Sequence, residues 1–328
     1  MAKRPTLEQQ LAALNDLRDD PYCEVAREQL RKVLAGKSSF LVAKAATMAR
    51  EFELAALLPL LPTAFDRFMT NPLKTDKGCK AKTAIADALF HLGYNDDDVF
   101  LRGIRHVQLE PGYGGRADTA PDLRGACALG LVATNYPDTM TELAHLLADA
   151  EPPARIAAAR AIAYSGQGPA GVPVLRYKSL IGDDHPQVVC ECFAALLKLA
   201  PDASLPFVTD FLDRADVQVS EAAAMAIGES RLDPAFDILK QWSDRIVDPA
   251  RRRTALVAIA MLRYDRAIDF LLSLIVDAPQ TVASDAIVAL AMHRYDDRFR
   301  QRVEAAAAQR EDIDLRPSIT EAFDGEDQ

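Results

Sequence analysis

The fold of this chain is decided by one recurring stretch, which is clearest at Pro152-Pro153-Ala154-Arg155-Ile156-Ala157-Ala158-Ala159-Arg160-Ala161-Ile162-Ala163. Proline is well tolerated in the first turn of an α-helix, where its missing N–H has no partner to lose, so we expect a helix to begin at Pro152. Ala158 precedes Ile162 by four residues, and the two therefore lie on one face of that helix. This face offers a branched aliphatic side chain beside a small residue that lets another backbone approach closely.

The same pattern recurs along the latter part of the chain. The aliphatic position has equivalents at intervals of 31, 34, 31, 32 and 31 residues, namely Leu131, Ile162, Leu196, Ile227, Ile259 and Leu290. The position before it is always small: Gly130, Ala161, Ala195, Ala226, Ala258 and Ala289. The position four before it is small as well: Cys127, Ala158, Cys192, Ala223, Ala255 and Ala286. A fixed period of this length is typical of repeat architectures, in which each unit buries its apolar face against its neighbours.

Helix-start signals recur at the same phase. Prolines lie ten residues before the aliphatic position in four of the windows: Pro121, Pro152, Pro186 and Pro249. Four aspartates are predicted N-caps of nearby helices: Asp184, Asp216, Asp233 and Asp248. Second amphipathic segments lie between these helices, at residues 140–147, 172–181, 205–212, 235–242 and 267–275. No window shows sustained period-two alternation, so we predict essentially no sheet and an all-α fold, an α-solenoid of stacked antiparallel helix pairs.

The repeated stretch resembles the HEAT-repeat family, in the short bacterial form of the phycobilin-lyase-subunit type. Residues 217–228 and 249–260 follow the same template, and the resemblance is good over about residues 121–293. It implies a HEAT-like superhelix, which we expect as a single solenoid of about eight helix pairs over residues 1–310. Residues 1–120 fit the repeat only irregularly. Residues 311–328 hold seven acids and one base, which predicts a frayed acidic C-terminal tail.

Composition excludes several classes of protein. The chain has 38 Lys and Arg against 48 Asp and Glu, a net charge of −10, which is too acidic for a general nucleic-acid coat. Hydrophobic residues make up 49%, so the chain is not wholly disordered. No apolar run approaches the roughly 20 residues that a membrane helix needs. Five cysteines, an odd number, do not form a disulfide framework. We expect a cytoplasmic protein, because no apolar core of a signal peptide follows the basic N-terminus.

The repeat is interrupted between Leu89 and Leu131, where about ten extra residues are inserted, and insertions in solenoids map to loops on one face. Residues 103–120 are expected to be a loop with an aromatic residue and an arginine at its tip, and such side chains often anchor partners. We predict that this loop and the concave face bind a partner through Arg102, Arg105, His106, Tyr113, Arg116, Arg124 and Arg155. The first three are spaced for one helical face, and the last two begin the next repeat helices. The alternative is a solvated loop whose arginines pair with acids such as Asp118 and Asp122.

A second break spans residues 66–82. Asn71-Pro72 marks a turn, and four lysines follow it: Lys74, Lys77, Lys80 and Lys82. The plainer interpretation is a solvated loop between helices, and the alternative is contact with an anion or an acidic partner beside Arg102 and Arg105. Residues 74–124 hold eight bases and eight acids, so no strong positive field is predicted.

Three motifs with possible chemistry are rejected. Residues 166–171 match the G-x-G-x-x-G of a dinucleotide site, but a predicted helix precedes them where that site needs a strand. Cys190 and Cys192, with His185 nearby, lack further ligands at zinc-like spacing. Residues 95–98 lack the Gly and the distal Glu of a calcium loop. We therefore expect no catalytic residue, no metal and no cofactor.

These observations favour a non-catalytic protein-interaction scaffold or adaptor. Solenoids expose an extended surface, and nothing in the sequence assembles a nucleophile, a base and an oxyanion site. The expected partner is another protein, and no membrane is involved. The family resemblance implies an alternative, a bilin-lyase-like enzyme subunit or chaperone. A further alternative is a nucleic-acid-binding protein like the DNA glycosylases built from HEAT-like repeats, which the acidic balance and the single tryptophan, Trp242, make the least favoured.

Overall fold

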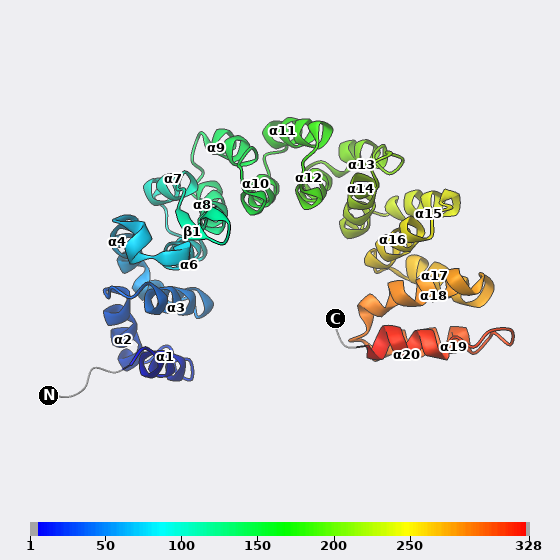
Figure 1. Ribbon diagram of the computed structural model, residues 1–328, viewed down its shortest axis with the longest axis horizontal. Helices are drawn as coiled ribbons and strands as arrows, with labels where there is room; N and C mark the ends of the chain where they lie inside the picture. Colours follow the sequence, from blue (N-terminus) through cyan, green and yellow to red (C-terminus); the bar gives the residue numbers. More distant parts are fainter. Residues whose placement is uncertain (1–5, 326–328) are drawn as a thin grey trace. The chain divides into compact units, whose positions relative to one another are not determined.

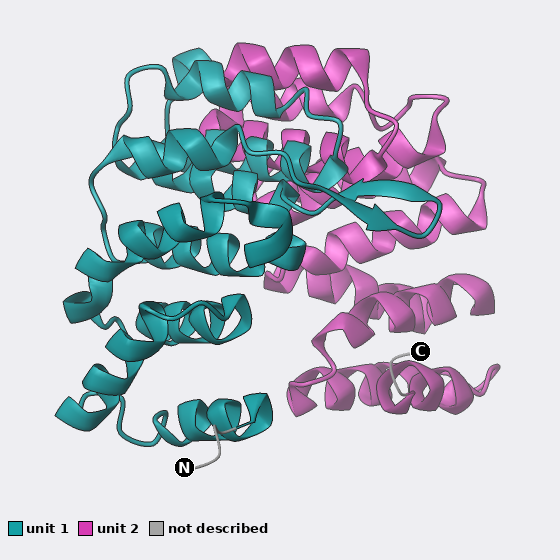
Figure 2. Ribbon diagram, turned by 60° about the vertical axis from the view of Figure 1, so that its left-hand side comes forward, with its two compact units in different colours: residues 1–170 teal, residues 171–328 magenta. Residues whose placement is uncertain are grey.

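The structure is a computed structural model, and it describes residues 6–325. The chain separates into two compact units, residues 1–170 (unit 1) and 171–328 (unit 2), which Figure 2 shows in different colours. Whereas the repeat predicts one solenoid over residues 1–310, the contacts of the chain are concentrated within these two units. Each unit consists of helix pairs stacked in chain order, so the predicted all-α solenoid class is confirmed.

Unit 1 begins with an irregular set of helices and becomes regular toward its end. Its elements are α1 (Leu7–Asp16), α2 (Glu24–Leu34), α3 (Ser39–Glu51), the 3₁₀ helix η1 (Ala55–Leu60), α4 (Leu61–Met69), α5 (Pro72–Thr75), η2 (Lys77–Cys79), α6 (Lys80–His91), α7 (Asp97–Ile104), β1 (Leu109–Gly112), β2 (Gly115–Asp118), α8 (Pro121–Ala133), α9 (Thr139–Leu146) and α10 (Pro152–Ser165).

Unit 2 is more regular, and its first helix begins just before the boundary. Its elements are α11 (Gly168–Ile181), α12 (Pro186–Leu199), α13 (Pro201–Thr209), α14 (Val217–Ser230), α15 (Ala235–Arg245), α16 (Pro249–Met261), α17 (Asp265–Asp277), α18 (Gln280–Leu290), η3 (Ala291–His293), α19 (Asp297–Ala307) and α20 (Arg316–Asp324).

One helix of each pair packs directly on its counterpart in the next pair. In unit 1, α3 packs against α6, α6 against α8, and α8 against α10. In unit 2, α12 packs against α14, α14 against α16, and α16 against α18. The other helices flank this layer, as Figure 1 shows for α9 beside α10 and α15 beside α16. Every residue of the three repeat columns is buried, so their predicted role as contact positions is confirmed.

Small residues are needed in this layer because backbone atoms of neighbouring helices come close together. At Gly228 in α14, a Cβ atom would lie 2.3 Å from the carbonyl oxygen of Ala258 in α16. At Gly130 in α8, a Cβ atom would lie 2.3 Å from the ring of Phe100 in α7. A larger side chain at such a position would force the helices apart, since protein interiors have few voids to absorb it.

The helices begin largely where the sequence predicts. The four prolines of the repeat are the first residues of α8, α10, α12 and α16. Asp216 and Asp248 cap α14 and α16 by accepting hydrogen bonds from backbone N–H groups of the first turn. The N-cap predictions for Asp184 and Asp233 are wrong, because α12 and α15 begin one residue further along and place the next residue at the N-cap.

Within the described residues, sheet is limited to one short hairpin in the insertion, so the prediction of essentially no sheet is confirmed. Residues 109–118, expected to lie in a loop, form an antiparallel hairpin in which Leu109 lies opposite Asp118 and Gly112 opposite Gly115. The turn is formed by Tyr113 and Gly114, and the φ of 90° at Gly114 is one that glycine adopts without strain. The strands were not predicted because each has only four residues, none of which is β-branched.

The prediction of a frayed tail is wrong for residues 316–324, half of its length. Residues 316–324 form α20, which packs against α18 and α19. Ile319 and Phe323 are buried in this contact, and apolar burial of this kind outweighs the acidic composition around them. Residues 326–328 of the expected tail lie outside the described residues. Within residues 6–325, no helix combines the length and the apolar character that crossing a membrane requires.

We predict that Gly228→Ala destabilises unit 2. In an ordinary helix interior this change stabilises by about 0.5–1 kcal/mol, but here the new methyl group would clash with the Ala258 carbonyl oxygen. We expect the sign to reverse, with a loss of about 1–3 kcal/mol in the free energy of unfolding measured in urea. Glu229→Ala, at the exposed neighbouring position, is the control and should change stability little. Equal stability of the two variants would contradict close backbone packing at Gly228.

Candidate partner-binding site

The hairpin of β1 and β2 projects from the helices of unit 1 (Figure 2). Its base rests on a fully buried ion pair between Lys82 in α6 and Asp76, whose Nζ and Oδ2 atoms lie 3.1 Å apart. Asp76 also caps α6, accepting hydrogen bonds from the backbone N–H groups of Ala81 at 2.9 Å and of Lys82 at 3.0 Å. This carboxylate therefore has both a countercharge and backbone donors, which is what an ionised group needs away from water.

Gln108, 1% exposed, joins the ion pair to the hairpin. Its Oε1 accepts a hydrogen bond from Lys82 Nζ at 2.8 Å, and its Nε2 donates to the Asp76 carbonyl oxygen at 2.8 Å. The same Nε2 donates to Glu110 Oε1 at 2.6 Å. One buried amide thus holds the start of β1 against the segment that precedes α6.

Glu110 forms a second attachment between the hairpin and that segment. Its Oε1 accepts hydrogen bonds from the Gly78 backbone N–H at 2.7 Å and from Thr119 Oγ1 at 2.9 Å. Burial raises the pKa of Glu110, but hydrogen bonds from Gln108, Gly78 and Thr119 outweigh burial and lower this pKa below its usual value. The ionised form is therefore the one that fits the site.

Asp118 and Arg124 close the other side of the hairpin. The Asp118 carboxylate accepts hydrogen bonds from the backbone N–H groups of Gln108 and Ala120, both at 3.0 Å, and lies 2.7 Å from Arg124 Nη1. Burial raises the pKa of Asp118, but these backbone and guanidinium donors outweigh it and lower the pKa. Arg124 also donates to Asp149 at 2.9 Å and to the His106 carbonyl oxygen at 2.9 Å. The base of the hairpin is thereby attached to both α8 and the α9–α10 connection.

Two of the predicted binding residues are buried, so their assignment to an exposed surface is wrong. Arg124 is 2% exposed and holds Asp118, as the alternative of pairing with nearby acids predicted. Arg155, 6% exposed, donates to the carbonyl oxygens of Asp149 at 2.9 Å and Ala150 at 3.0 Å. Each lies in the first turn of a helix that follows an irregular segment. Oxygen atoms of irregular segments accept hydrogen bonds from the guanidinium, which is therefore buried.

Arg102, Arg105 and His106 do not share one helical face, because α7 ends at Ile104. Arg102 lies 2.8 Å from both Asp66 and Asp98, with its guanidinium over the Phe65 ring. His106 is half-buried with Nε2 3.2 Å from Gln108 Oε1, and burial lowers its pKa.

Arg105 is exposed, and it pairs with a carboxylate that is mostly buried. Its Nε donates to Glu142 Oε2 at 3.1 Å, and a second contact joins Arg105 Nη2 to Glu142 Oε1. This hydrogen bonding lowers the pKa of Glu142. Arg105 therefore supports the α7–α9 region as well as facing solvent.

The exposed predicted residues lie beside a groove that sequence reasoning missed. Tyr113 is fully exposed at the hairpin turn, and Arg116 is exposed on β2. The groove has a volume of about 450 Å³ and is lined by Asn71, Pro72, Leu73, Lys74, Val107, Gln108, Leu109 and Arg116. We call these residues, together with Tyr113 at the adjacent tip, the hairpin groove.

Three large apolar side chains of the hairpin groove are exposed, Leu73 at 49%, Val107 at 57% and Leu109 at 45%. Val107 and Leu109 flank the buried Gln108, so alternate residues face outward and inward along this extended segment. That short apolar–polar–apolar alternation is the signal by which the sequence could have indicated the groove.

The lysine cluster divides into one buried and three exposed residues. Lys82 belongs to the buried ion pair, so for this residue the predicted solvated loop is wrong. Lys74, Lys77 and Lys80 are exposed, as is Arg116. Across the described part of the chain, none of these four exposed cations forms an ion pair with an acid of the protein.

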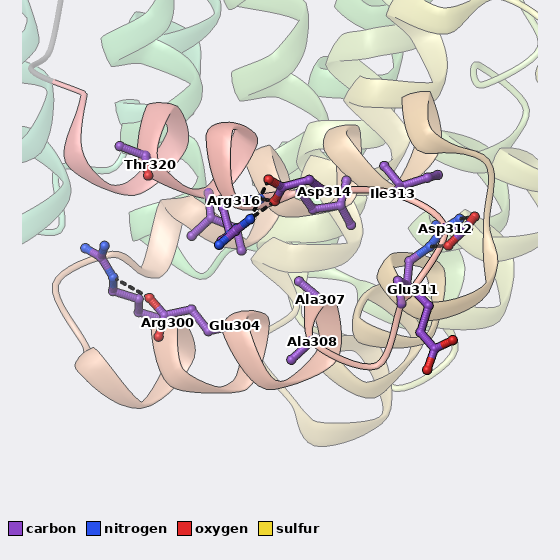
Figure 3. Close-up of a pocket in the computed structure, with 13 residues that line it drawn as sticks. Arg300, Glu304, Ala307, Ala308, Glu311, Asp312, Ile313, Asp314, Arg316 and Thr320 are labelled. Carbon is purple, nitrogen blue, oxygen red and sulfur yellow. Dashed lines mark hydrogen bonds and ion pairs between the residues drawn. The ribbon is translucent and has the colours of Figure 1, made fainter.

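A larger cavity of about 660 Å³ lies in unit 2 between α19 and α20, and its charges are arranged differently (Figure 3). Arg300 pairs with Glu304 at 3.0 Å, Arg310 with Asp312 at 2.7 Å, and Arg316 with Asp314 at 2.9 Å. These guanidinium groups are already satisfied by neighbouring carboxylates, as the dashed lines in Figure 3 show for Arg316 and Arg300. The hairpin groove, with unpaired cations beside apolar side chains, is therefore the better candidate for binding.

We predict that Lys82→Met destabilises unit 1 by about 3–5 kcal/mol, because it leaves the buried Asp76 carboxylate without its countercharge. The free energy of unfolding in urea measures this effect. Lys80→Met, an exposed substitution in the same helix, is the matched control and should stay within about 0.5 kcal/mol of the wild type. A wild-type stability for Lys82→Met would show that the pair does not hold this region.

We predict that Glu110→Gln costs about 1 kcal/mol at pH 7, since it weakens the hydrogen bonds from Gly78, Gln108 and Thr119. The pKa of Glu110 is lowered in the folded state, so its stabilising contribution is present above the usual glutamate pKa of about 4.3 and is lost below it. The difference between variant and wild type in free energy of unfolding should therefore shrink from pH 7 to pH 3. The exposed Glu53→Gln serves as control. A difference that grows in acid would refute the ionised attachment.

Comparison with known proteins finds similar chains among the solved structures. No family model matches the chain, and no curated protein matches it. Among solved structures, the complex of CpcE and CpcF of phycocyanin lyase from Nostoc is similar, with a TM-score of 0.37 and 18% sequence identity. The match covers 74% of this chain and 93% of that chain.

Proposed function

We propose that this protein is a non-catalytic interaction scaffold that binds a protein partner through the hairpin groove. The observation that carries this proposal is the exposure of Leu73 in α5 and of Val107 and Leu109 at the start of a hairpin whose base is held by buried hydrogen bonds. A cluster of exposed apolar side chains with a polar rim is typical of a protein-interaction surface.

The rigidity of the hairpin base supports a binding role. Association costs conformational entropy for every side chain or loop that must be ordered, and a surface that is already ordered lowers that cost. Gln108 lies between Val107 and Leu109 and is fixed by Lys82 and Glu110, so the two apolar side chains are presented from a constrained backbone. Tyr113 and Arg116 add the residue types that most often dominate binding energy at interfaces.

The polar groups of the hairpin base favour a structural role over chemistry. Lys82, Asp76 and Gln108 are engaged with one another and are buried away from any substrate. A catalytic acid, base or nucleophile would need access to the reacting atoms. We therefore assign no catalytic residue to this site.

The other functional alternatives stay predictions. No feature of the described residues favours a bilin-lyase-like subunit or a nucleic-acid-binding protein over the scaffold. A contribution of the concave face to partner binding also stays a prediction.

We predict that a partner protein is captured through Tyr113. The full chain, carrying a photo-crosslinking amino acid in place of Tyr113, should form one dominant crosslinked product when expressed in its source cells. Tyr113→Ala should lower recovery of the same partner in quantitative affinity purification by at least tenfold, since about 1.4 kcal/mol corresponds to tenfold in affinity. Tyr295→Ala removes another highly exposed tyrosine, which belongs to unit 2, and should leave recovery unchanged. Equal recovery by both variants, or turnover of a small molecule without a partner, would contradict the proposal.

A further inference from the structure

We infer that the hairpin groove accepts an acidic peptide segment that also carries apolar side chains. This inference rests on the proposed function and names the chemistry of the partner. It follows from three properties of the groove. Its cations form no ion pairs, nearby carboxylates are bound by other residues of the chain, and its aliphatic side chains are exposed.

The cations of this region are of two kinds. Arg102, Arg105 and Arg124 each pair with a carboxylate of the chain. Lys74 and Arg116, which line the groove, and Lys77 and Lys80, which follow it, are exposed and form no ion pair within residues 6–325. The lining of the groove contains no carboxylate. In a chain with a net charge of −10, this is a local positive surface on an acidic protein.

The acids closest in sequence do not cancel this surface. Asp76 is fully buried against Lys82, and Asp118 is held by Arg124. Glu110 has no ion-pair partner and leaves one negative charge, but its carboxylate is turned inward to Gly78, Gln108 and Thr119. Of these three acids only Glu110 is without an ion pair, and its carboxylate faces inward. The exposed cations that line the groove, Lys74 and Arg116, therefore favour an acidic ligand.

The aliphatic side chains of the groove favour a ligand that carries apolar groups as well as negative charge. Leu73, Val107 and Leu109 are each about half exposed, so apolar ligand groups that cover them would gain hydrophobic stabilisation. The volume of about 450 Å³ falls within the range of sites that take a small ligand or a few side chains. The groove thus fits a short segment in which acidic and apolar side chains alternate.

The range of electrostatic interaction distinguishes a short peptide from larger polyanions. At physiological ionic strength, charges more than about 8 Å apart are largely screened. A short segment in the groove therefore interacts mainly with the cations next to it. A nucleic acid or an anionic bilayer would extend across neighbouring surface of a chain whose net charge is −10, and would be repelled there. Among the residues of the hairpin groove, Tyr113 at the tip carries the single aromatic ring, so the groove offers no series of rings on which successive bases would stack.

The inference is tested by fluorescence anisotropy with the full chain and three labelled synthetic peptides of twelve residues. The first alternates Asp and Glu with Leu and Phe, the second replaces the acids with Asn and Gln, and the third replaces Leu and Phe with Ser. We expect the first peptide to bind at least tenfold more tightly than the other two. Its affinity should fall as salt is raised, because its charges are exposed to solvent.

Matched variants localise the binding. Lys74→Gln with Arg116→Gln should weaken binding of the first peptide at least tenfold, and Leu109→Ser should weaken it to a similar degree. Lys37→Gln with Lys198→Gln removes the same charge at exposed positions elsewhere and should have no effect. Equal binding of the acidic and the uncharged peptide would overturn the inference, as would tighter binding of single-stranded DNA or anionic vesicles that the groove variants abolish.

Failure of the inference is distinguishable from failure of the proposed function. If capture of a partner depends on Tyr113 but the acidic peptide does not bind, the scaffold function stands and the assigned partner chemistry is wrong. If the acidic peptide binds but partner capture is the same for Tyr113→Ala and Tyr295→Ala, the chemistry of the groove stands and its role in the scaffold is wrong.

Discussion

The close approach of helix backbones at small residues is the constraint on which this structure depends. Helices of neighbouring pairs meet where the repeat places Ala, Cys or Gly, and at Gly228 the carbonyl oxygen of Ala258 occupies the space that a side chain would need. Because no helix pair buries its apolar face alone, each pair draws its stability from the next one in the stack. The high alanine content is thus a requirement of the packing, and it leaves the surface free to vary.

The insertion between α7 and α8 cannot use this packing, and it is held by polar contacts. A short hairpin has little apolar area to bury and is marginally stable in isolation. Here Gln108 and Glu110 attach the first strand to the segment before α6, and Asp118 with Arg124 attaches the second. The fully buried pair of Lys82 and Asp76 anchors these contacts. If one member of this network were missing, the remaining buried polar groups would lack partners and the fold would be destabilised. The network therefore specifies one position for the hairpin.

The side chains that attach the hairpin to the helices are different from the side chains that it exposes for binding. The side chains of Gln108, Glu110 and Asp118 face inward and form hydrogen bonds there, while Val107, Leu109, Tyr113 and Arg116 are exposed. Alternation along an extended backbone is what allows adjacent residues to take opposite roles. Unit 2 offers a larger cavity, but its arginines are neutralised by nearby carboxylates, so size alone does not indicate a binding site.

The helical repeat, the helix starts at the prolines and the burial of the small columns could be predicted from the sequence, because they depend on residues within one helix and on a constant period. The exposure of Tyr113 and Arg116 could be predicted as well. The burial of Arg124, Arg155 and Lys82 and the hairpin of residues 109–118 could not. Those outcomes depend on contacts between residues far apart in the chain, such as Lys82 with Gln108 and Gly78 with Glu110. A charged side chain is buried or exposed according to the partners that the fold brings to it, and local sequence does not contain that information.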